Sequence, residues 1–350
     1  MSLSRAADAR VELAHGAGGR ASAELISGLF ARHFANEWLL RGDDGAALPG
    51  LAPGDRLVLA TDSHVVSPLF FPGGDIGCLA VHGTLNDVAM MGARPLWLAA
   101  AFILEEGFLL ADLERIVISM ARAAQESGAP IVTGDTKVVE RGKGDGVFIT
   151  TTGAGALAAE KNIGGAAARV GDVLLVSGTI GDHGMTILNA RQGLDTLSAG
   201  MDFASAVVSD TAALWPLVEA LGAANVEIHV LRDPTRGGLG ATLNEIAAQS
   251  RAGLRLEERD IPVSPAVAAS CEFLGLDPLY LANEGKLLLL CPEADAPRAL
   301  EVMRGHPLGR NAAAIGRVVE DARGFVEMRT RTGGRRLIDW LAGDPLPRIC

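Results

Sequence analysis

The feature that most constrains the fold is the alternation of strand-like and helix-like segments along the chain. Residues 55–61 (DRLVLAT) are a β-rich run. Apolar side chains at positions 110, 113, 117, 120 and 124 recur at the spacing of an amphipathic helix, which Gly128 ends. Residues 130–133 and 147–152 indicate further strands. The pattern predicts an α/β fold of the α+β type.

A second series of segments follows a stretch of small residues at 153–171, which is the best candidate for a domain boundary. Strand-like runs then lie at 172–177, 227–231, 253–257, 278–282 and 286–291, and a last helix is expected near 337–341. The 350 residues suffice for two domains of ordinary size. We expect an N-terminal domain at 1–158, a C-terminal domain at 159–342 and a tail at 343–350.

The composition limits the classes of partner and compartment. Charged residues make up only 21% of the chain and hydrophobic residues 49%, which excludes disorder. The net charge of −11 argues against a nucleic-acid-binding or anionic-membrane surface. The longest apolar run, 96–104, is too short to span a bilayer, and the first residues carry no secretory signal. The expected location is therefore cytoplasmic.

Four cysteines occur without the CxxC spacing of a zinc site. Cys78, Cys271 and Cys291 have apolar neighbours and are expected to be small buried side chains. Cys350 is the final residue and follows two prolines, which hold a segment extended. Two interpretations stay open at this point: a frayed end, or a mobile thiol that carries a group to an active site.

Aspartates recur at the ends of predicted strands and in glycine-rich turns: Asp43, Asp44, Asp62, Asp87 and Asp135. Each one alone is typical of a turn or a helix N-cap. Together they favour a Mg²⁺–nucleotide site, because converging carboxylates need a hard cation. Walker A and GxGxxG sequences are missing, but the glycine-rich loop 15–20 offers backbone N–H groups to phosphates. Arg232 and Arg236 are candidate phosphate clamps or surface ion-pair partners.

A possible acid–base group lies in the segment Asn283-Glu284-Gly285-Lys286, between two strand-like runs. The alternative for this segment is an ordinary hairpin turn. His64 and His183 each stand beside an aspartate in comparable loops. For each histidine, a hydrogen-bonded structural role is as compatible with the sequence as a catalytic one.

Six ordered segments resemble the HypE family of hydrogenase maturation factors, which are carbamoyl dehydratases. The segments are 61–77 (TDSHVVSPLFFPGGDIG), 83–89 (GTLNDVA), 132–139 (VTGDTKVV), 181–184 (GDHG), 283–286 (NEGK) and 347–350 (PRIC). The resemblance implies a two-domain architecture like that of aminoimidazole ribonucleotide synthetase, with mixed sheets, a flexible C-terminal tail and a homodimer formed through the first domain. It also implies ATP-dependent dehydration of a carbamoylated terminal cysteine to a thiocyanate, which supplies cyanide to the iron of [NiFe]-hydrogenase.

The resemblance assigns roles to individual residues. Cys350 is the carrier, Glu284 the base with His64 as an alternative, and Lys137 contacts the phosphate or the thiocarboxamide. The implied Mg²⁺–ATP ligands are Asp44, Asp62, Asp87 and Asp135, with Asp43 as a neighbour and Thr61 and Asn86 as supporting polar contacts. The implied partners are a HypF-like carbamoyltransferase and an iron-carrying HypC–HypD-like complex.

Two rival functions are compatible with the same fold. A selenophosphate synthetase-like kinase would need a reactive cysteine near the N-terminal glycine-rich loop, and the first 77 residues contain none. A non-catalytic maturation scaffold would not need the acidic residues together with Lys137 and Glu284.

Overall fold

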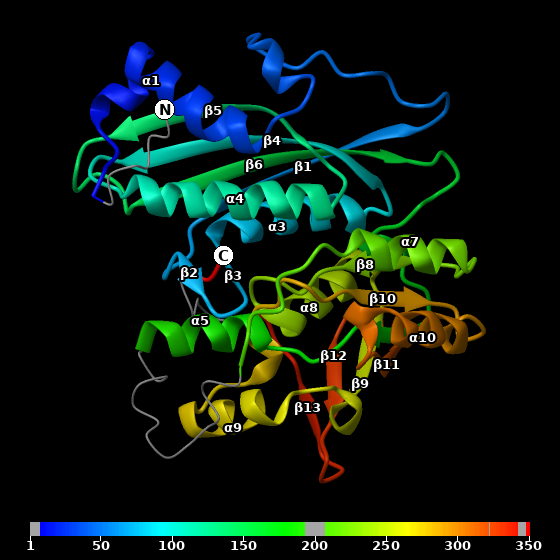
Figure 1. The fold of residues 1–350 in the computed structure, drawn as a ribbon. Helices are drawn as coiled ribbons and strands as arrows, with labels where there is room; N and C mark the ends of the chain where they lie inside the picture. The colour runs from blue at the N-terminus through cyan, green and yellow to red at the C-terminus, as the bar shows by residue number, and fades with distance from the viewer. Residues whose placement is uncertain (1–7, 193–206, 322, 342–347) are drawn as a thin grey trace.

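The computed structural model describes residues 8–192, 207–321, 323–341 and 348–350, and it places two sheets in two lobes (Figure 1). The first sheet has the order β1-β6-β4-β5. Its strands are β1 (Arg56–His64), β4 (Arg94–Glu105), β5 (Ile131–Val139) and β6 (Val147–Leu157). Only β4 and β5 are parallel, so this sheet is mixed.

Two helices cover the inner face of the first sheet, α3 (Ile76–Met90) and α4 (Leu110–Glu126). Helix α4 buries one stripe of apolar side chains, as its periodicity predicts. Asp75 caps the N-terminus of α3, where its carboxylate accepts from the backbone N–H groups of Gly77 (2.7 Å) and Cys78 (3.1 Å). Helix α3 is buried on nearly all sides because it lies between the sheet and the second domain.

The segment before β1 is helical and lies beside the edge strand β5 (Figure 1). It comprises η1 (Leu13–Gly16), α1 (Arg20–Leu25), η2 (Ile26–Phe30), α2 (Ala31–His33) and η3 (Leu39–Arg41). Phe30 packs on Phe102 of β4, with ring centroids 4.8 Å apart. A short hairpin of β2 (Phe70–Phe71) and β3 (Gly74–Asp75) precedes α3.

The second sheet has the order β13-β12-β9-β11-β7-β10-β8 and a single parallel pair, β12 with β9. Its strands are β7 (Val173–Val176), β8 (Val230–Arg232), β9 (Gly253–Glu257), β10 (Leu288–Cys291), β11 (Ala313–Val319), β12 (Val326–Arg329) and β13 (Arg335–Leu337). Leu174 and Val176 pack with α8 (Gly238–Ser250), whereas Val173 and Leu175 pack with α7 (Trp215–Ala223) and α10 (Ala296–Gly305). Central strands covered on both faces explain their uninterrupted apolar sequences.

One apolar cluster joins the two lobes. It contains the first domain's core together with Met185 and Ile187 of α5 (Asp182–Gln192), Cys271 of α9 (Pro265–Leu274) and Ile349. The end of the chain therefore lies between the domains, where Figure 1 marks the C-terminus. Residues 342–347, with both tail prolines, lie outside the described part. The expected burial holds for Cys271 and Cys291, while Cys78 is half-buried.

The expected mixed α/β architecture is confirmed, but three local predictions are wrong. The run 278–282 is not a strand: Pro278–Tyr280 forms the 3-10 turn η7, capped by Asp277. The run 337–341 is not a helix, because Arg335–Leu337 pairs with β12 as β13. Asp62 and Asp135 do not follow strands; both lie within them, in β1 and β5. Among the described residues, no helix is long and apolar enough to cross a membrane.

Candidate functional site

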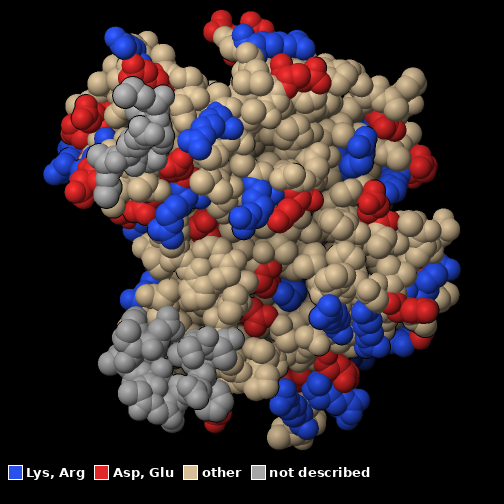
Figure 2. Space-filling model, viewed as in Figure 1, with Lys and Arg blue, Asp and Glu red and all other residues tan. Residues whose placement is uncertain are grey.

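Four carboxyl groups from both domains influence one another at the domain junction. Asp62 comes from β1 and Asp87 from α3, while Asp233 follows β8 and Glu284 precedes β10. Asp62 shares its cross-strand row with Thr151, which donates to the Ala80 carbonyl of α3 (2.8 Å). That row faces α3, so the sheet presents Asp62 toward the second domain. Figure 2 shows acidic and basic side chains at this junction.

Asp87, Asp233 and Glu284 hold their protons unusually tightly. Burial raises the pKa of Asp87 to about 7, helped by the charges of Asp233 and Asp62. Burial, with the Asp62 charge, raises the pKa of Asp233 to about 6. Buried carboxylates that lie close together repel one another. A bound cation would reduce this repulsion and favour their ionised form.

Glu284 is the most strongly affected member. It is 3% exposed, and its Oε1 has no hydrogen-bond partner among the described residues. Burial raises its pKa well above the ordinary value, and the charges of Asp210, Asp233, Asp62 and Asp87 act in the same direction. A buried, unpartnered carboxyl oxygen of this kind is typical of a functional group rather than of a structural one.

The loop that carries Glu284 is held from several directions and is not a hairpin turn. Asp210 accepts from the N–H groups of Glu284 (3.1 Å) and Gly285 (3.2 Å) and pairs with Lys286 Nζ (3.0 Å). The Asn86 amide of α3 donates to the Glu284 carbonyl (3.4 Å). Asn86, predicted as a supporting residue, thus contacts this loop. The hydrogen bonds from Asn86 and Asp210 fix the position of the Glu284 main chain.

The two arginines of the loop after β8 have different surroundings. Arg232 is ion-paired with Glu245 of α8. Arg236 is more exposed and lies 3.9 Å from Asp62 Oδ1. The Arg236 guanidinium is therefore the group of this loop that is available to an incoming phosphate.

The last three residues of the chain lie against the residues that follow β1. The Val65 N–H donates to the main-chain oxygen of Cys350 (3.1 Å), and the Ser67 N–H donates to the Arg348 carbonyl (3.2 Å). Arg348 pairs with Asp145, and the Ile349 side chain is buried. The terminal cysteine thus sits next to the end of the strand that carries Asp62.

His64 lies on the same side of β1 as Asp62. It is 1% exposed, and its Nε2 is 3.6 Å from Asp62 Oδ2. Burial lowers its pKa, which keeps the imidazole neutral near pH 7. Its Nδ1 has no partner among the described residues. A neutral histidine at this position has the capacity to accept a proton.

The structure does not bring Asp135 and Lys137 to the acidic junction of the same chain. Asp135 shares its cross-strand row with Ser63, one residue beyond Asp62, so it points to the opposite face of the sheet. Strands β1 and β5 are opposite edges of the sheet, about 14 Å apart at 4.8 Å per strand. Lys137 Nζ is 2.6 Å from Asp135 Oδ2, and both side chains are exposed. Thr61 also points to this outer face.

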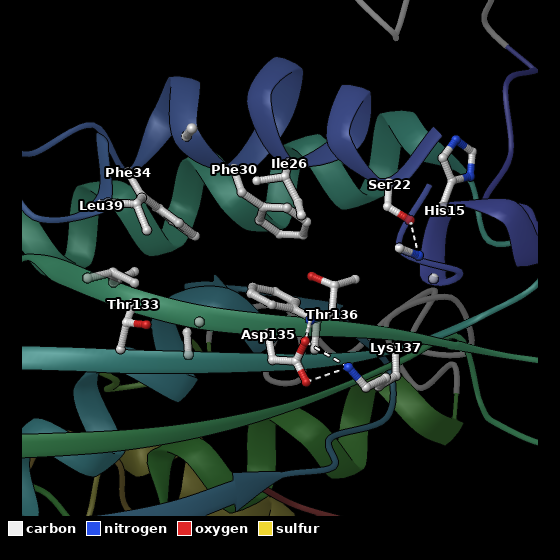
Figure 3. A pocket seen from close by; sticks show the side chains of 17 residues that line it. His15, Ser22, Ile26, Phe30, Phe34, Leu39, Thr133, Asp135, Thr136 and Lys137 are labelled. Atoms are coloured by element: carbon white, nitrogen blue, oxygen red, sulfur yellow. Dashed lines mark hydrogen bonds and ion pairs between the residues drawn. The ribbon is translucent and has the colours of Figure 1, made fainter. Parts of the chain in front are cut away.

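A pocket of about 240 Å³ lies between the N-terminal helices and β5 (Figure 3). Ile26, Phe30, Phe34 and Leu39 form its apolar wall, and Figure 3 shows them opposite the β5 side chains. His15 and Gly16 of the predicted glycine-rich loop line one end together with Asp135, Thr136 and Lys137. The pocket combines an apolar slot with a polar end, as binding sites for small molecules do.

The predicted metal set is not assembled within one chain. Asp43 and Asp44 lie in an exposed loop, and neither contributes to the pKa shifts of the junction. Within the described ranges, no three acidic, histidine or cysteine side chains are arranged to hold a metal ion by themselves. The unpartnered Glu284 oxygen and the raised pKa values of Asp87 and Asp233 nevertheless fit a cation whose remaining ligands are phosphate oxygens or water.

The sequence interpretation missed Asp233, Asp210 and the structural role of Lys286. The signal for Asp233 was present, because it lies between the two singled-out arginines in Arg232-Asp-Pro-Thr-Arg236, directly after a strand-like run. Asp210 carried no such signal: its importance comes from its contacts with a loop 74 residues further along the chain.

Comparisons with known proteins define the class. The model of the AIR synthase related protein N-terminal domain matches residues 42–157, and that of the corresponding C-terminal domain matches residues 169–329. Thiamine monophosphate kinase from Aquifex aeolicus has the same fold, with a TM-score of 0.60 at 22% identity, covering 81% of this chain and 91% of that one. The chain is thus built from the two AIR synthase related domains.

Closer relatives define the family within that class. "Carbamoyl dehydratase HypE" of Cupriavidus necator is 62% identical over 341 residues, covering 97% of this chain and 95% of the relative. The same-named protein of Escherichia coli is 49% identical, covering 97% and 99%. A crystal structure of the hydrogenase maturation protein HypE in complex with ATP matches with a TM-score of 0.91 at 52% identity, covering 97% and 99%. The chain belongs to the HypE family.

Proposed function

We propose that this chain catalyses ATP-dependent dehydration of a carbamoyl group carried by the Cys350 thiol. The thiocarboxamide becomes a thiocyanate, the carbonyl oxygen leaves with the phosphate, and both N–H protons are removed. The thiocyanate supplies the cyanide ligand for the iron of [NiFe]-hydrogenase. The observation that carries the proposal is the buried Glu284 carboxyl, at the junction where the last residues of the chain also lie.

Glu284 serves as the base that removes the N–H protons. Its Oε1 has no hydrogen-bond partner in the described part of the chain, and Asp210 fixes its main chain. The raised pKa favours proton uptake once the carboxylate has formed. His64 is the alternative acceptor, because it is neutral and its Nδ1 meets no hydrogen-bond partner among the residues that the structure describes.

ATP and Mg²⁺ are assigned to the acidic junction. ATP supplies the phosphoryl group that turns the carbonyl oxygen into a leaving group. Asp62, Asp87 and Asp233 hold the cation, and Arg236 binds a phosphate oxygen. The similar crystal structure of HypE in complex with ATP supports the nucleotide assignment. Asp44 remains a predicted ligand from its exposed loop.

A homodimer accounts for the separate position of Asp135 and Lys137. The outer face of the first sheet exposes Leu57 (57%), Leu59 (63%) and Ile103 (43%), side chains that a second copy would cover. Contact through this face would place Asp135 and Lys137 in the interface. These two residues are then assigned to the site of the partner protomer.

Two further partners follow from the reaction. A HypF-like carbamoyltransferase loads Cys350, and a crystal structure of a HypE–HypF complex, 46% identical to this chain, supports this partner. An iron-carrying HypC–HypD-like complex receives the cyanide. We assign the whole sequence of steps to the cytoplasm.

Mass spectrometry of the C-terminal peptide tests the proposed reaction. The peptide should gain a carbamoyl group on loading and lose one water when ATP is added. Cys350→Ala, which lacks the carrier, is the control for ADP formation. If the loaded wild-type protein forms ADP no faster than this variant, and its peptide loses no water, the proposed function is wrong.

A further inference from the structure

The first turn of α5 places a fully buried histidine against the end of the chain. His183 is 0% exposed, and its ring packs edge-on against Phe71 at 5.5 Å. Its Nε2 lies 2.8 Å from the Ile349 carbonyl oxygen, and its Nδ1 lies 2.8 Å from Ser209 Oγ. A carbonyl oxygen can only accept, so Nε2 carries the proton and Nδ1 accepts from the Ser209 hydroxyl.

The backbone on both sides of His183 is tied to the loop that carries Glu284. The Gly181 N–H donates to Asn283 Oδ1 (2.7 Å), and the Gly184 N–H donates to the Ala282 carbonyl (3.0 Å). A side chain on Gly184 would meet the Ala282 nitrogen at 2.9 Å, so the two backbones are in direct contact. The histidine therefore cannot shift far without moving this loop.

A second connection runs through the hydroxyl partner of His183. Ser209 precedes Asp210, which accepts from the N–H groups of Glu284 and Gly285. The Ser209 Oγ also accepts from the Thr211 N–H (3.3 Å). The tail carbonyl and the imidazole are thus linked to the loop of the proposed base by hydrogen bonds and by the peptide bond between Ser209 and Asp210.

The other end of α5 holds the preceding tail carbonyl. Arg191 donates to the Ser67 carbonyl (2.5 Å) and to the Arg348 carbonyl. Arg191 is partly exposed, whereas His183 is enclosed. Release of the tail therefore leaves a buried N–H donor without its acceptor, a cost that favours the seated tail.

We propose that His183 is a positioning residue for the dehydration step. Its hydrogen bond holds the Ile349 carbonyl in place, and thereby sets the position of the modified Cys350 thiol relative to the Glu284 loop. The assignment rests on the proposed function for the identity of the reaction. His183 is not expected to assist loading, because the Cys350 thiol must leave this position to enter the active site of another protein.

Three variants test the assignment. His183→Ala removes the N–H donor, and His183→Gln restores a donor of similar reach. His229→Ala is the matched control, because His229 is also buried (4% exposed) and bonded on both ring nitrogens, to Asp172 and Glu227. Three quantities are measured for each intact protein. They are the rate at which iodoacetamide alkylates Cys350, read from the C-terminal peptide after digestion, the rate of carbamoyl loading, and the single-turnover rate of water loss from loaded protein.

His183→Ala should be alkylated faster at Cys350 and should lose water at least about tenfold more slowly, with loading no slower than in wild type. His183→Gln should recover most of the loss, and His229→Ala should resemble wild type in all three readouts.

Three results would overturn the assignment: wild-type dehydration by His183→Ala, equal slowing by His229→Ala, or a parallel fall in loading. If wild-type protein itself loses no water, the proposed function fails instead, and the alkylation rates still decide whether His183 seats the tail.

Discussion

A single methyl group at Gly285 should impair both catalysis and stability. A Cβ built on Gly285 would lie 1.8 Å from the Asp210 carbonyl oxygen, and real Cβ atoms essentially never come within 3.0 Å. The backbone must therefore move by more than 1 Å. Asp210 cannot yield alone, because its carboxylate is bonded to Lys286 and to the Glu284 N–H. In Gly285→Ala the loop that positions Glu284 is displaced.

Both the rate and the stability should fall, by comparable free energies. Overpacking of this kind costs about 1–3 kcal/mol of unfolding free energy. A displacement of about 1 Å at a reacting group costs roughly 100-fold in rate. Urea unfolding gives the first quantity, and single-turnover water loss from loaded protein gives the second.

Gly305→Ala is the control, because a Cβ there meets no atom of the described residues within 4 Å. It should match wild type in both assays. Dehydration by Gly285→Ala within about threefold of wild type would refute the argument that the position of this loop sets the position of the base.

Three further predictions address the base, the acidic junction and the dimer. Glu284→Gln keeps the shape but cannot take a proton, so loading should persist while water loss falls about 100-fold or more; equal water loss by both proteins would exclude Glu284 as the base. The pKa of Asp87 is about 7 in the folded protein, against 3.8 for an ordinary aspartate, so the folded state binds more protons than the unfolded state between these pH values. The melting temperature of nucleotide-free protein should therefore fall as pH rises from 4 to 7. Asp87→Asn should flatten that slope in a thermal scan, and an unchanged slope would contradict the assignment. Mixing inactive Lys137→Ala and Glu284→Gln proteins should restore about a quarter of wild-type sites if Lys137 acts in the partner's site; no recovery despite confirmed subunit exchange would place Lys137 elsewhere.

The local pattern of the sequence determined the architecture and the family. Periodicity alone placed α4 and the strand at 253–257, because both depend on the pattern of apolar side chains. Long ordered motifs, from Thr61 to the terminal Cys350, identified the family. The local pattern failed at 278–282, where a proline and the Asp277 cap outweigh apolar β propensity.

The sequence also named most candidate site residues, but only tertiary structure decided which of them meet. Asp62 and Asp135 look equivalent along the chain, as acidic residues near strand ends. The register of four strands turns them to opposite faces and opposite edges, because side-chain direction alternates at every residue of a strand. Asp210 and His183 acquire their roles from contacts over 74 and 166 residues of sequence, which no local pattern records. Sequence determines which groups are present; packing between the domains determines which carboxyl groups are buried away from water, and hence where we place the proposed chemistry.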